Sequence, residues 1–269
     1  MASDGKVVVE KVGEKSSVTR CFSKYPLKFI SPRKVGPSKT DAVWIYSLTY
    51  GGGVVSGDSI SCEFTIGDAC TTVLTTQAST KVYKSMGSKC SEQVLEKQVF
   101  RVVSDSSLVI VDWITSGRHE SGEKWDFDLY KSTNHIFLED NQPLFLDTVL
   151  LERGSIASIA EHMQDYQVIA MVVLLGPKLK QVQDQVQKDV KRIMSEQLHI
   201  PSASLGHQVM TKSDRFLMKP SFIASTSVFG PKGIGVVVRI AAMTTESVYK
   251  FLHHQLACLE PLLGMSPYR

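Results

Sequence analysis

The sequence predicts a mainly β protein, a multi-stranded layered β architecture with about two long helices packed in its C-terminal half. From residue 6 to 152, short strand-like segments follow one another between turn residues, with no helical periodicity among them. From residue 153 to 269, strand-like runs alternate with helical patterns. We therefore expect a single domain over residues 1–269, with a β-rich part (6–152) and an α/β part (153–269).

Alternation of apolar and polar residues predicts the strands of the β-rich part. The clearest is Ser59–Ile66, in which Ile60, Cys62, Phe64 and Ile66 alternate with polar residues, the pattern of a half-buried strand. The other predicted strands are Val7–Val12, Ser17–Ile30, Ala42–Tyr50, Thr71–Thr76, Val94–Val103, Leu108–Ile114, Trp125–Thr133 and Leu144–Leu150.

The α/β part is predicted to begin with a short helix at Ser155–Gln164 and a buried strand at Val168–Leu175. A long helix is expected over Lys178–His199, because its apolar side chains recur on one face and charged ones cover the other. A strand at Ile234–Met243 then precedes a helix over Thr245–Leu263.

Composition excludes several classes of protein. The chain of 269 residues has a net charge of +3, too close to balance to indicate nucleic-acid binding. The longest apolar run, Val168–Leu175, is too short to span a membrane, and the N-terminus has no apolar signal segment. Five cysteines without a C-x-x-C pair favour reduced thiols. We expect a cytoplasmic protein with no membrane or nucleic-acid partner.

A glycine-rich segment, Gly51–Asp58, nearly matches a phosphate-binding loop. The G-x-x-x-x-G spacing is present, but Asp58 replaces the lysine that would pair with phosphate, and a strand pattern follows where a helix is required. We interpret the segment as a turn whose glycines adopt backbone conformations closed to other residues.

No set of catalytic residues stands out, so the sequence predicts no enzyme. A G-x-S-x-G elbow is missing, and His119 and His135 have no spacing that would direct a base at a nucleophile. His253 and His254 are adjacent on a predicted helix and point in different directions, so they cannot chelate one metal ion. A glycosidase-type carboxylate pair and an enzyme of unknown type stay open, although nothing singles one out.

Two aspartates lie inside predicted buried strands, Asp112 in Leu108–Ile114 and Asp147 in Leu144–Leu151. An unpaired carboxylate in an apolar interior costs several kcal/mol, so each needs a partner, a proton or water. One interpretation is a structural ion pair or hydrogen bond. The other is that both line a wet internal path together with Asp58 and Thr80, because a cation in transit needs oxygen ligands that release it.

Four segments resemble the urease accessory protein D family (UreD, called UreH in some systems) in order and approximate spacing: Tyr25–Pro32, Gly51–Asp58, Thr75–Ser85 and Trp113–Trp125. The resemblance implies a mostly β fold with two helices and a non-catalytic chaperone of urease activation. It also implies docking on apo-urease and binding of UreF, which recruits the nickel-carrying GTPase UreG. No permanently bound cofactor is expected, only a transient nickel ion.

By motif, the resemblance makes Asp58, Thr80, Asp112 and Asp147 candidates for the lining of a nickel path. Arg118 and Glu123 are expected to pair across a turn, and Lys81 and Tyr83 to share one strand face. All motif residues expected to be structural or partner-binding are Gly51, Gly52, Gly53, Gly57, Thr76, Gln77, Lys81, Tyr83, Gly117, Arg118, Gly122 and Glu123.

The chain departs from the family pattern after Glu96. The family continues there through a further strand and turn, whereas Lys97–Arg101 follows at once, so about 20–30 residues are absent, two or three strands at usual lengths. An alternative transcript would produce such a join. We expect its loss to expose sheet edges and lower stability. Two other readings stay open: a β-rich adaptor unrelated to nickel, and a shortened, poorly active form of the accessory protein.

Overall fold

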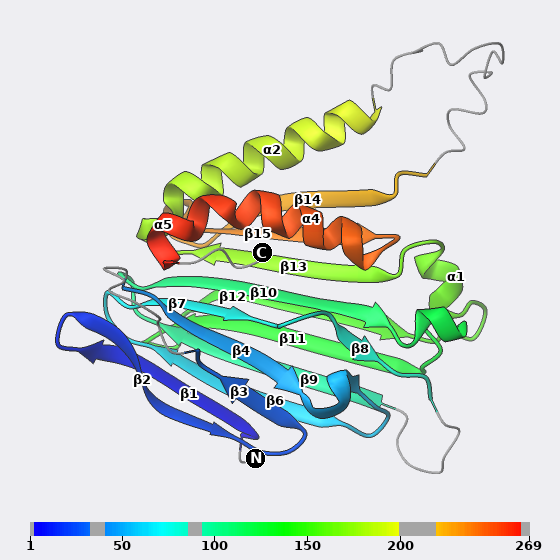
Figure 1. Cartoon of the computed structure of the whole chain (residues 1–269), viewed down its shortest axis with the longest axis horizontal. Coiled ribbons are helices and arrows are strands. Elements are labelled where there is room, and N and C mark those ends of the chain that lie inside the picture. Colours follow the sequence, from blue (N-terminus) through cyan, green and yellow to red (C-terminus); the bar gives the residue numbers. More distant parts are fainter. Residues whose placement is uncertain (1–2, 33–40, 86–92, 199–218, 265–269) are drawn as a thin grey trace.

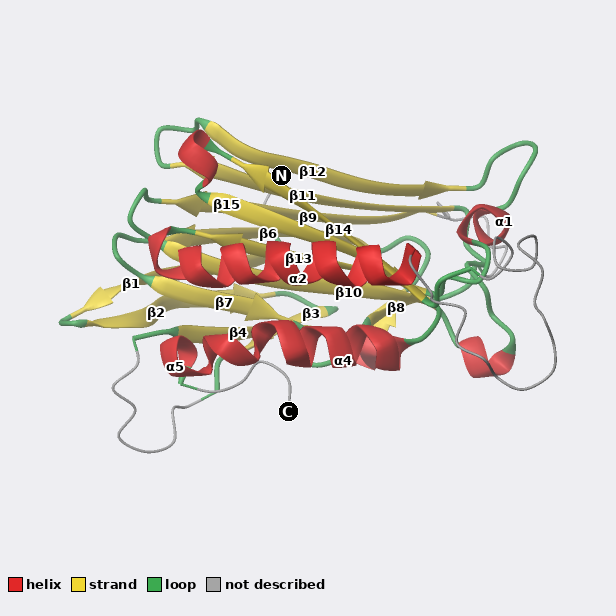
Figure 2. Cartoon of the chain, turned by 90° about the horizontal axis from the view of Figure 1, so that it is seen from above, coloured by secondary structure: helices red, strands yellow, loops and turns green. Residues whose placement is uncertain are grey.

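Two β-sheets lie face to face, and helices cover the free face of one of them (Figures 1 and 2). The computed structural model describes residues 3–32, 41–85, 93–198 and 219–264. Within these ranges the strands form a six-stranded sheet, here the outer sheet, and a nine-stranded sheet, here the central sheet. The mainly β fold class with two long helices is confirmed.

The outer sheet has a simple strand order. It runs β12 (Pro143–Glu152), β11 (Leu129–Leu138), β9 (Gln93–Val102), β6 (Ser59–Ile66), β1 (Gly5–Val12) and β2 (Lys15–Ser23).

The central sheet combines strands from both parts of the chain. Its order is β14 (Phe222–Phe229), β15 (Gly235–Ala242), β13 (Val168–Leu175), β10 (Ser107–Ser116), β7 (Thr71–Thr75), β4 (Val43–Thr49) and β3 (Leu27–Ile30). The short strand β8 (Thr80–Val82) pairs with β10 and with β5 (Gly53–Val54).

The helices lie mainly on the side of the central sheet that faces away from the outer sheet. The longest are α2 (Lys180–Leu198) and α4 (Thr245–Leu256), and none in the described ranges is long and apolar enough to cross a membrane. Short helices and 3-10 turns complete the chain: η1 (Tyr50–Gly52), η2 (His119–Ser121), α1 (Ile159–Met163), η3 (Pro177–Leu179), η4 (Pro231–Gly233), η5 (Ala257–Leu259) and α5 (Glu260–Leu263).

Strand β10 contributes to two separate cores. Leu108, Ile110 and Ile114 pack in the core between the two sheets, while Val109 and Trp113 pack in the core between the central sheet and the helices. Because successive side chains of a strand point to opposite faces, a strand covered on both faces is apolar throughout. Asp112 has the parity of Ile110 and Ile114, so its side chain enters the layer between the sheets.

The structure corrects several predicted elements. Ser17–Ile30 is two strands in different sheets, because Pro26 has no N–H to continue a ladder. The strand predicted at Trp125 begins at Leu129, since Trp125 has a left-handed backbone (φ 54°). Helix α1 begins at Ile159 behind the N-cap Ser158, later than predicted. Strands β5 and β14 were not predicted.

The strand that carries the join, β9, is continuous. It pairs with β11 over its whole length and with β6 from Leu95 onward, in parallel on both sides. The edges of the outer sheet are β12 and β2, so the join itself exposes no sheet edge. The expected exposed edge does not lie at the join, because one strand spans the join without a break.

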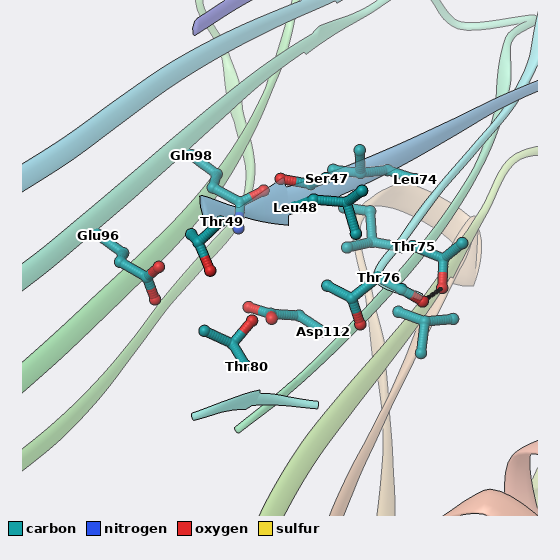
Figure 3. Close-up of a pocket in the computed structure, with 12 residues that line it drawn as sticks. Ser47, Leu48, Thr49, Leu74, Thr75, Thr76, Thr80, Glu96, Gln98 and Asp112 are labelled. Carbon is teal, nitrogen blue, oxygen red and sulfur yellow. Dashed lines mark hydrogen bonds between the residues drawn. The ribbon is translucent and has the colours of Figure 1, made fainter. Parts of the chain in front are cut away.

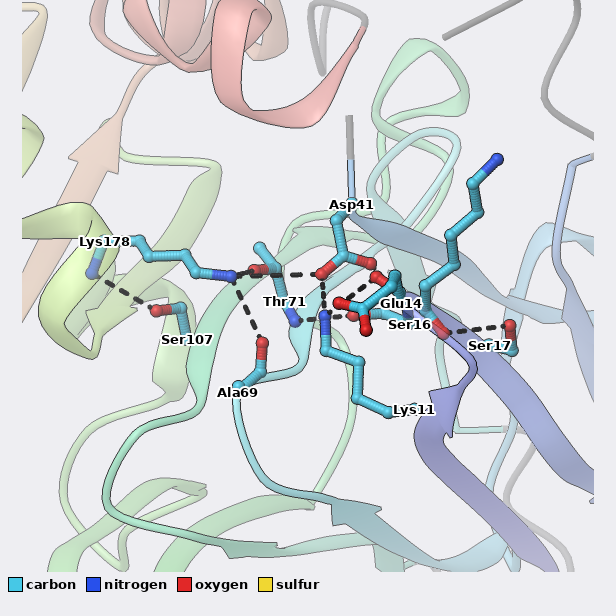
Figure 4. Close-up of polar contacts among 10 residues, drawn as sticks. Lys11, Glu14, Ser16, Ser17, Asp41, Ala69, Thr71, Ser107 and Lys178 are labelled. Carbon is cyan, nitrogen blue, oxygen red and sulfur yellow. Dashed lines mark hydrogen bonds and ion pairs between the residues drawn. The ribbon is translucent and has the colours of Figure 1, made fainter. Parts of the chain in front are cut away.

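A polar cluster around Asp41 links both sheets to the start of the helical layer (Figure 4). The Asp41 carboxylate accepts hydrogen bonds from the Lys11 ammonium and the Ser16 N–H, and the Lys178 ammonium lies 4.0 Å away. Lys178 also donates to the Thr71 hydroxyl at 3.0 Å. Burial raises the pKa of Asp41, but the hydrogen bonds from Lys11 and Ser16 outweigh it and the pKa ends below its ordinary value.

We expect Asp41→Asn to lower the free energy of unfolding by about 1–2 kcal/mol at pH 7, because charge-assisted hydrogen bonds are lost. A depressed folded pKa stabilises above the unfolded value of about 3.9. The difference from wild type should therefore shrink as pH falls below about 4. Urea unfolding at pH 7 and 3.5 measures it.

Asp184→Asn is the matched control, since Asp184 pairs with Lys180 on the exposed side of α2. Exposed pairs contribute about 0.5 kcal/mol or less. Equal losses for the two variants would show that the Asp41 cluster does not hold the layers together.

Candidate functional site

A small pocket, with a cavity volume of about 30 Å³, lies between the two sheets (Figure 3). Glu96 enters it from the outer sheet, and Asp112 enters it from the central sheet. Figure 3 shows their carboxyl groups facing the same space, with the hydroxyls of Thr49 and Thr80 beside them. The pocket is therefore lined by oxygen atoms at its centre.

A second small pocket, with a cavity volume of about 30 Å³, adjoins the first through Asp112, which lines both. Its outer-sheet wall is formed by Tyr130, Ser132 and Asn134 of β11. Asp112 thus stands between two spaces in the interior of the protein.

Strand parity explains why these polar groups meet. On β9, Val94, Phe100 and Val102 face the core between the sheets, and Glu96 and Gln98 have the same parity. On β11, Asn134 lies beside Gln98 in register. One section of the inter-sheet layer is consequently polar, while the rest is packed with apolar side chains.

The electrostatics of the pocket favour protonated carboxyl groups. Burial raises the pKa of Glu96 to about 7, helped by the negative charge of Asp112 and opposed by a 2.5 Å hydrogen bond from the Tyr130 hydroxyl. Burial likewise raises the pKa of Asp112 to about 6, opposed by hydrogen bonds from the Trp113 N–H and Asn134. Protons and cations therefore compete for these oxygens near neutral pH.

The structure brings two of the four predicted path residues, Thr80 and Asp112, together in the pocket. Asp58 lies outside the lining: its Oδ2 accepts from the Val55 N–H at 2.9 Å, as a turn residue does. Its carbonyl accepts from the Leu95 N–H at 2.9 Å, next to Glu96, whose pKa its charge also raises.

Asp147 lies outside both pockets, in register with Asn134 of β11. It is buried, and its Oδ1 accepts a 2.6 Å hydrogen bond from the Arg239 guanidinium. Its Oδ2 has no hydrogen-bond partner among the described residues. Asp147 thus forms the ion pair that one of the two interpretations requires, whereas Asp112 forms none with any described residue.

Sequence reasoning missed Glu96, Tyr130 and Asn134. A signal was present for Glu96, since it shares parity with Val94, Phe100 and Val102 exactly as Asp112 shares parity with its apolar neighbours. Tyr130 and Asn134 are ordinary strand residues, and only the pairing of β11 with β9 makes them neighbours of a carboxylate.

The motif glycines serve two purposes. Left-handed backbone conformations occur at Gly51, Gly52 and Gly57, as predicted for the glycine turn, and also at Gly117 and Gly122. Gly53 is different, because its backbone is extended. A Cβ there would lie 2.3 Å from the Lys81 carbonyl oxygen, so close approach of β5 and β8 requires this glycine.

The other motif residues divide between the pocket and the surface. Thr76 lines the pocket, whereas Gln77 is exposed. Lys81 is exposed and Tyr83 half-buried, with Val82 buried opposite them.

The predicted pair forms between the Arg118 guanidinium and the buried Glu123 carboxylate, at 2.7 Å. Within the described ranges no group of three or more His, Cys, Asp or Glu side chains could hold a metal ion.

Comparison with known proteins identifies the family. The profile of the UreD urease accessory proteins matches residues 2–100 and 93–269. The chain belongs to the UreD family.

Urease accessory protein D of Arabidopsis thaliana is 62% identical over 290 aligned positions, covering 98% of this chain and 99% of the relative. The protein of the same name from Oryza sativa subsp. indica is 54% identical, covering 99% and 95%. UreD of Sorangium cellulosum is 27% identical, covering 99% and 83%. UreD proteins are non-catalytic chaperones of urease activation, involved in nickel insertion.

The same comparisons bear on the join in β9. The profile matches in two parts that overlap at residues 93–100, within β9. The alignment with the Arabidopsis protein has 290 positions, more than the 269 residues of this chain, so the relative has residues without a counterpart here. Both findings agree with a segment missing near Glu96.

We expect Glu96→Gln/Asp112→Asn to stabilise the chain at pH 8 by about 1 kcal/mol or more, since one pKa unit is equivalent to about 1.4 kcal/mol. Above the ordinary carboxyl pKa of about 4, the folded wild type holds more protons than the unfolded chain, so its stability falls as pH rises. The variant does not lose stability in this way, so its melting temperature should be closer to that of wild type at pH 5. Melting temperatures at both pH values measure the effect, with Asp184→Asn as control; a variant destabilised at pH 8 would contradict it.

A chain with the segment of the Arabidopsis protein inserted between Glu96 and Lys97 is expected to melt about 5 °C higher or more, because added strands bury more apolar surface. Thermal melts of the two chains test this. Equal melting points and equal cooperativity would show that β9 alone replaces the segment without loss.

Proposed function

We propose that this protein is a non-catalytic chaperone that docks on apo-urease and, together with UreF and the GTPase UreG, supports nickel insertion into urease. Nickel passes transiently between the two sheets through the pocket of Glu96, Asp112 and Thr80. The position of Asp112 between two adjoining pockets carries this proposal, because it extends the oxygen lining across the inter-sheet layer.

The chemistry of the pocket suits transit rather than storage. Carboxylate and hydroxyl oxygens bind divalent transition metals more weakly than sets of imidazole and thiolate ligands do. Conduction requires binding that is favourable enough to admit an ion and weak enough to release it. With pKa values of about 7 and about 6, Glu96 and Asp112 exchange a proton for a cation near neutral pH at small cost.

We assign the remaining path candidates to the two ends of this passage. We assign Asp58 to the approach, because its negative charge raises the pKa of Glu96. Asp147 is placed at the far end, beyond Asn134. Arg239 neutralises Asp147, so the passage itself is assigned to Glu96, Asp112 and Thr80.

Membership of the family supports the proposed partners. UreF binds this chain and brings UreG. GTP hydrolysis is assigned to UreG, because in this chain Gly51–Asp58 leads into strand β6 and not into the helix that a phosphate-binding loop requires. No nucleic-acid or membrane partner is proposed. The cytoplasm is the proposed location, since the cysteines in the described ranges are free thiols.

Two alternatives differ in their observable consequences. A β-rich adaptor unrelated to nickel would bind its partners regardless of Glu96 and Asp112, and urease would mature without it. A shortened, poorly active form would bind the same partners but transfer nickel less well than a chain with the segment restored.

We expect Glu96→Gln/Asp112→Asn to lower the nickel content of urease about tenfold or more in a reconstitution with UreF, UreG, nickel and GTP, because amides bind divalent cations more weakly than carboxylates. Metal analysis of purified urease measures the loss, and pull-downs with UreF and apo-urease should be unchanged. Asp184→Asn is the control.

The same variant is expected to gain stability at pH 8, so unfolding would not explain a loss of nickel. Full nickel content would show that the pocket is not the path. A wild-type chain that binds neither UreF nor apo-urease would refute the chaperone assignment.

A further inference from the structure

The four family-like segments converge at one end of the sandwich. The rings of Tyr25 and Tyr50 lie 5.6 Å apart, which joins the first segment to the glycine turn. The Tyr83 hydroxyl donates to the Gly51 carbonyl at 2.9 Å, and the Arg118 guanidinium lies 5.9 Å from the Tyr83 ring centre. We call the resulting surface the tyrosine–cation rim; it consists of Tyr25, Tyr50, Tyr83, Lys81, Lys84 and Arg118.

The rim is continuous with the carboxylate pocket. Thr49 and Thr80 line the pocket, and the next residues along the chain are Tyr50 and Lys81 of the rim. In Figure 1, η1 (which begins at Tyr50) and β8 lie at the end of the sandwich opposite to the β1–β2 turn. The rim therefore adjoins the lining of the pocket at η1 and β8.

The backbone beneath the rim is tightly packed against the Glu123 side chain. A Cβ at Gly117 would lie 2.4 Å from Oε2 of Glu123, which accepts a 3.0 Å hydrogen bond from the Arg118 N–H. The hydrogen bond from the Arg118 N–H lowers the pKa of Glu123 below its ordinary value and outweighs burial, which raises it. A charged Glu123 thus fixes Arg118, whose side chain remains 56% exposed.

The exposed groups of the rim combine aromatic rings with positive charge. Glu123 offsets part of that charge, because it pairs with Arg118 and its pKa is also lowered by Lys84. Tyr25 is 81% exposed and Tyr50 54%. Lys28 lies 5.9 Å from the Tyr50 ring centre, and neither it, Lys81 nor Lys84 forms an ion pair with a described residue. The exposed Glu120 and Asp126 lie nearby in sequence to Arg118 but form no ion pair with these lysines in the described chain. Tyrosine and arginine are enriched at protein interfaces, and positive patches meet negative ones.

We propose that the tyrosine–cation rim docks an acidic segment of a partner protein over the mouth of the carboxylate pocket. This rests on the proposed function, in which a partner hands a cation to this chain. The exposed lysines repel a free cation at the mouth. Acidic side chains of a docked partner neutralise them, so the pocket admits a cation only while the partner is in place. Nucleic acid is a poorer occupant, because the net charge of the chain is only +3.

The test is a double charge reversal, Lys81→Glu/Lys84→Glu, with Lys188→Glu/Lys191→Glu on the exposed side of α2 as a control of equal charge change. Binding of UreF and of apo-urease is measured at about 50 and 500 mM salt, where Debye lengths differ about threefold. We expect the rim variant to bind one of the two partners about tenfold or more weakly at low salt, and the control to stay within about twofold of wild type. Tyr50→Ser should weaken the same partner without a change of charge.

Binding of a labelled decaglutamate peptide tests the rim independently of the proposed function. At low salt it should bind wild type more tightly than Lys81→Glu/Lys84→Glu. The inference is overturned if the rim variant binds UreF, apo-urease and decaglutamate as well as wild type does, or if the α2 control loses as much. If wild type binds neither protein, the proposed function fails while the peptide result still decides the rim. Thermal melts show that each variant is folded.

Discussion

The middle strands of the central sheet are covered on both faces, and this constraint decides where a polar side chain of these strands can lie. A residue on β10 points either into the layer between the sheets or toward the helices, and neither side is open water. Asp112 enters the inter-sheet layer, where it finds Glu96, Tyr130 and Asn134 instead of a cation. The protein accommodates the cost with raised pKa values and with pocket space beside the carboxyl groups, not with an ion pair.

The fold could be predicted well from the sequence where a pattern reports a local constraint. Ser59–Ile66 is a strand from end to end because its alternation is strict, and β13 is a continuous apolar run covered on both faces. The edge strand β14 escaped prediction because it mixes small polar and apolar residues. Asp112 was recognisable as misplaced in an apolar run. Its neighbours Glu96, Tyr130 and Asn134 could not be predicted, because they come together only when β9 pairs with β11, which follows it in the chain after β10. Arg239 was also beyond reach, since it lies 92 residues from its partner Asp147.

Parity also explains why one strand can span the join. Val94 and Glu96 precede it and Gln98 and Phe100 follow it, and all four share the inward face of β9. A shift of one residue would have turned the second half of the strand inside out, burying Lys97 and exposing Phe100. The parallel hydrogen bonds to β6 and β11 then continue in unbroken register across the join. Residues 93–100, which match both parts of the family profile, lie within this strand.

The inter-sheet layer has an apolar section, which stabilises the fold, and a polar section, which contains the carboxylate-lined pocket. Aromatic rings such as Phe64 and Phe100, stacked 4.8 Å apart, pack the apolar section. The Asp41 cluster ties both sheets to the helical layer beside the β1–β2 turn, at the end of the sandwich opposite to β8. With the layers fixed there, the section around Asp112 need not contribute to stability. A carboxylate-lined space inside a sheet sandwich is a net cost to folding, and it persists because the cost is confined to one end. The same confinement places the pocket beside η1, β8 and the Arg118 loop, the surface where a partner would reach it.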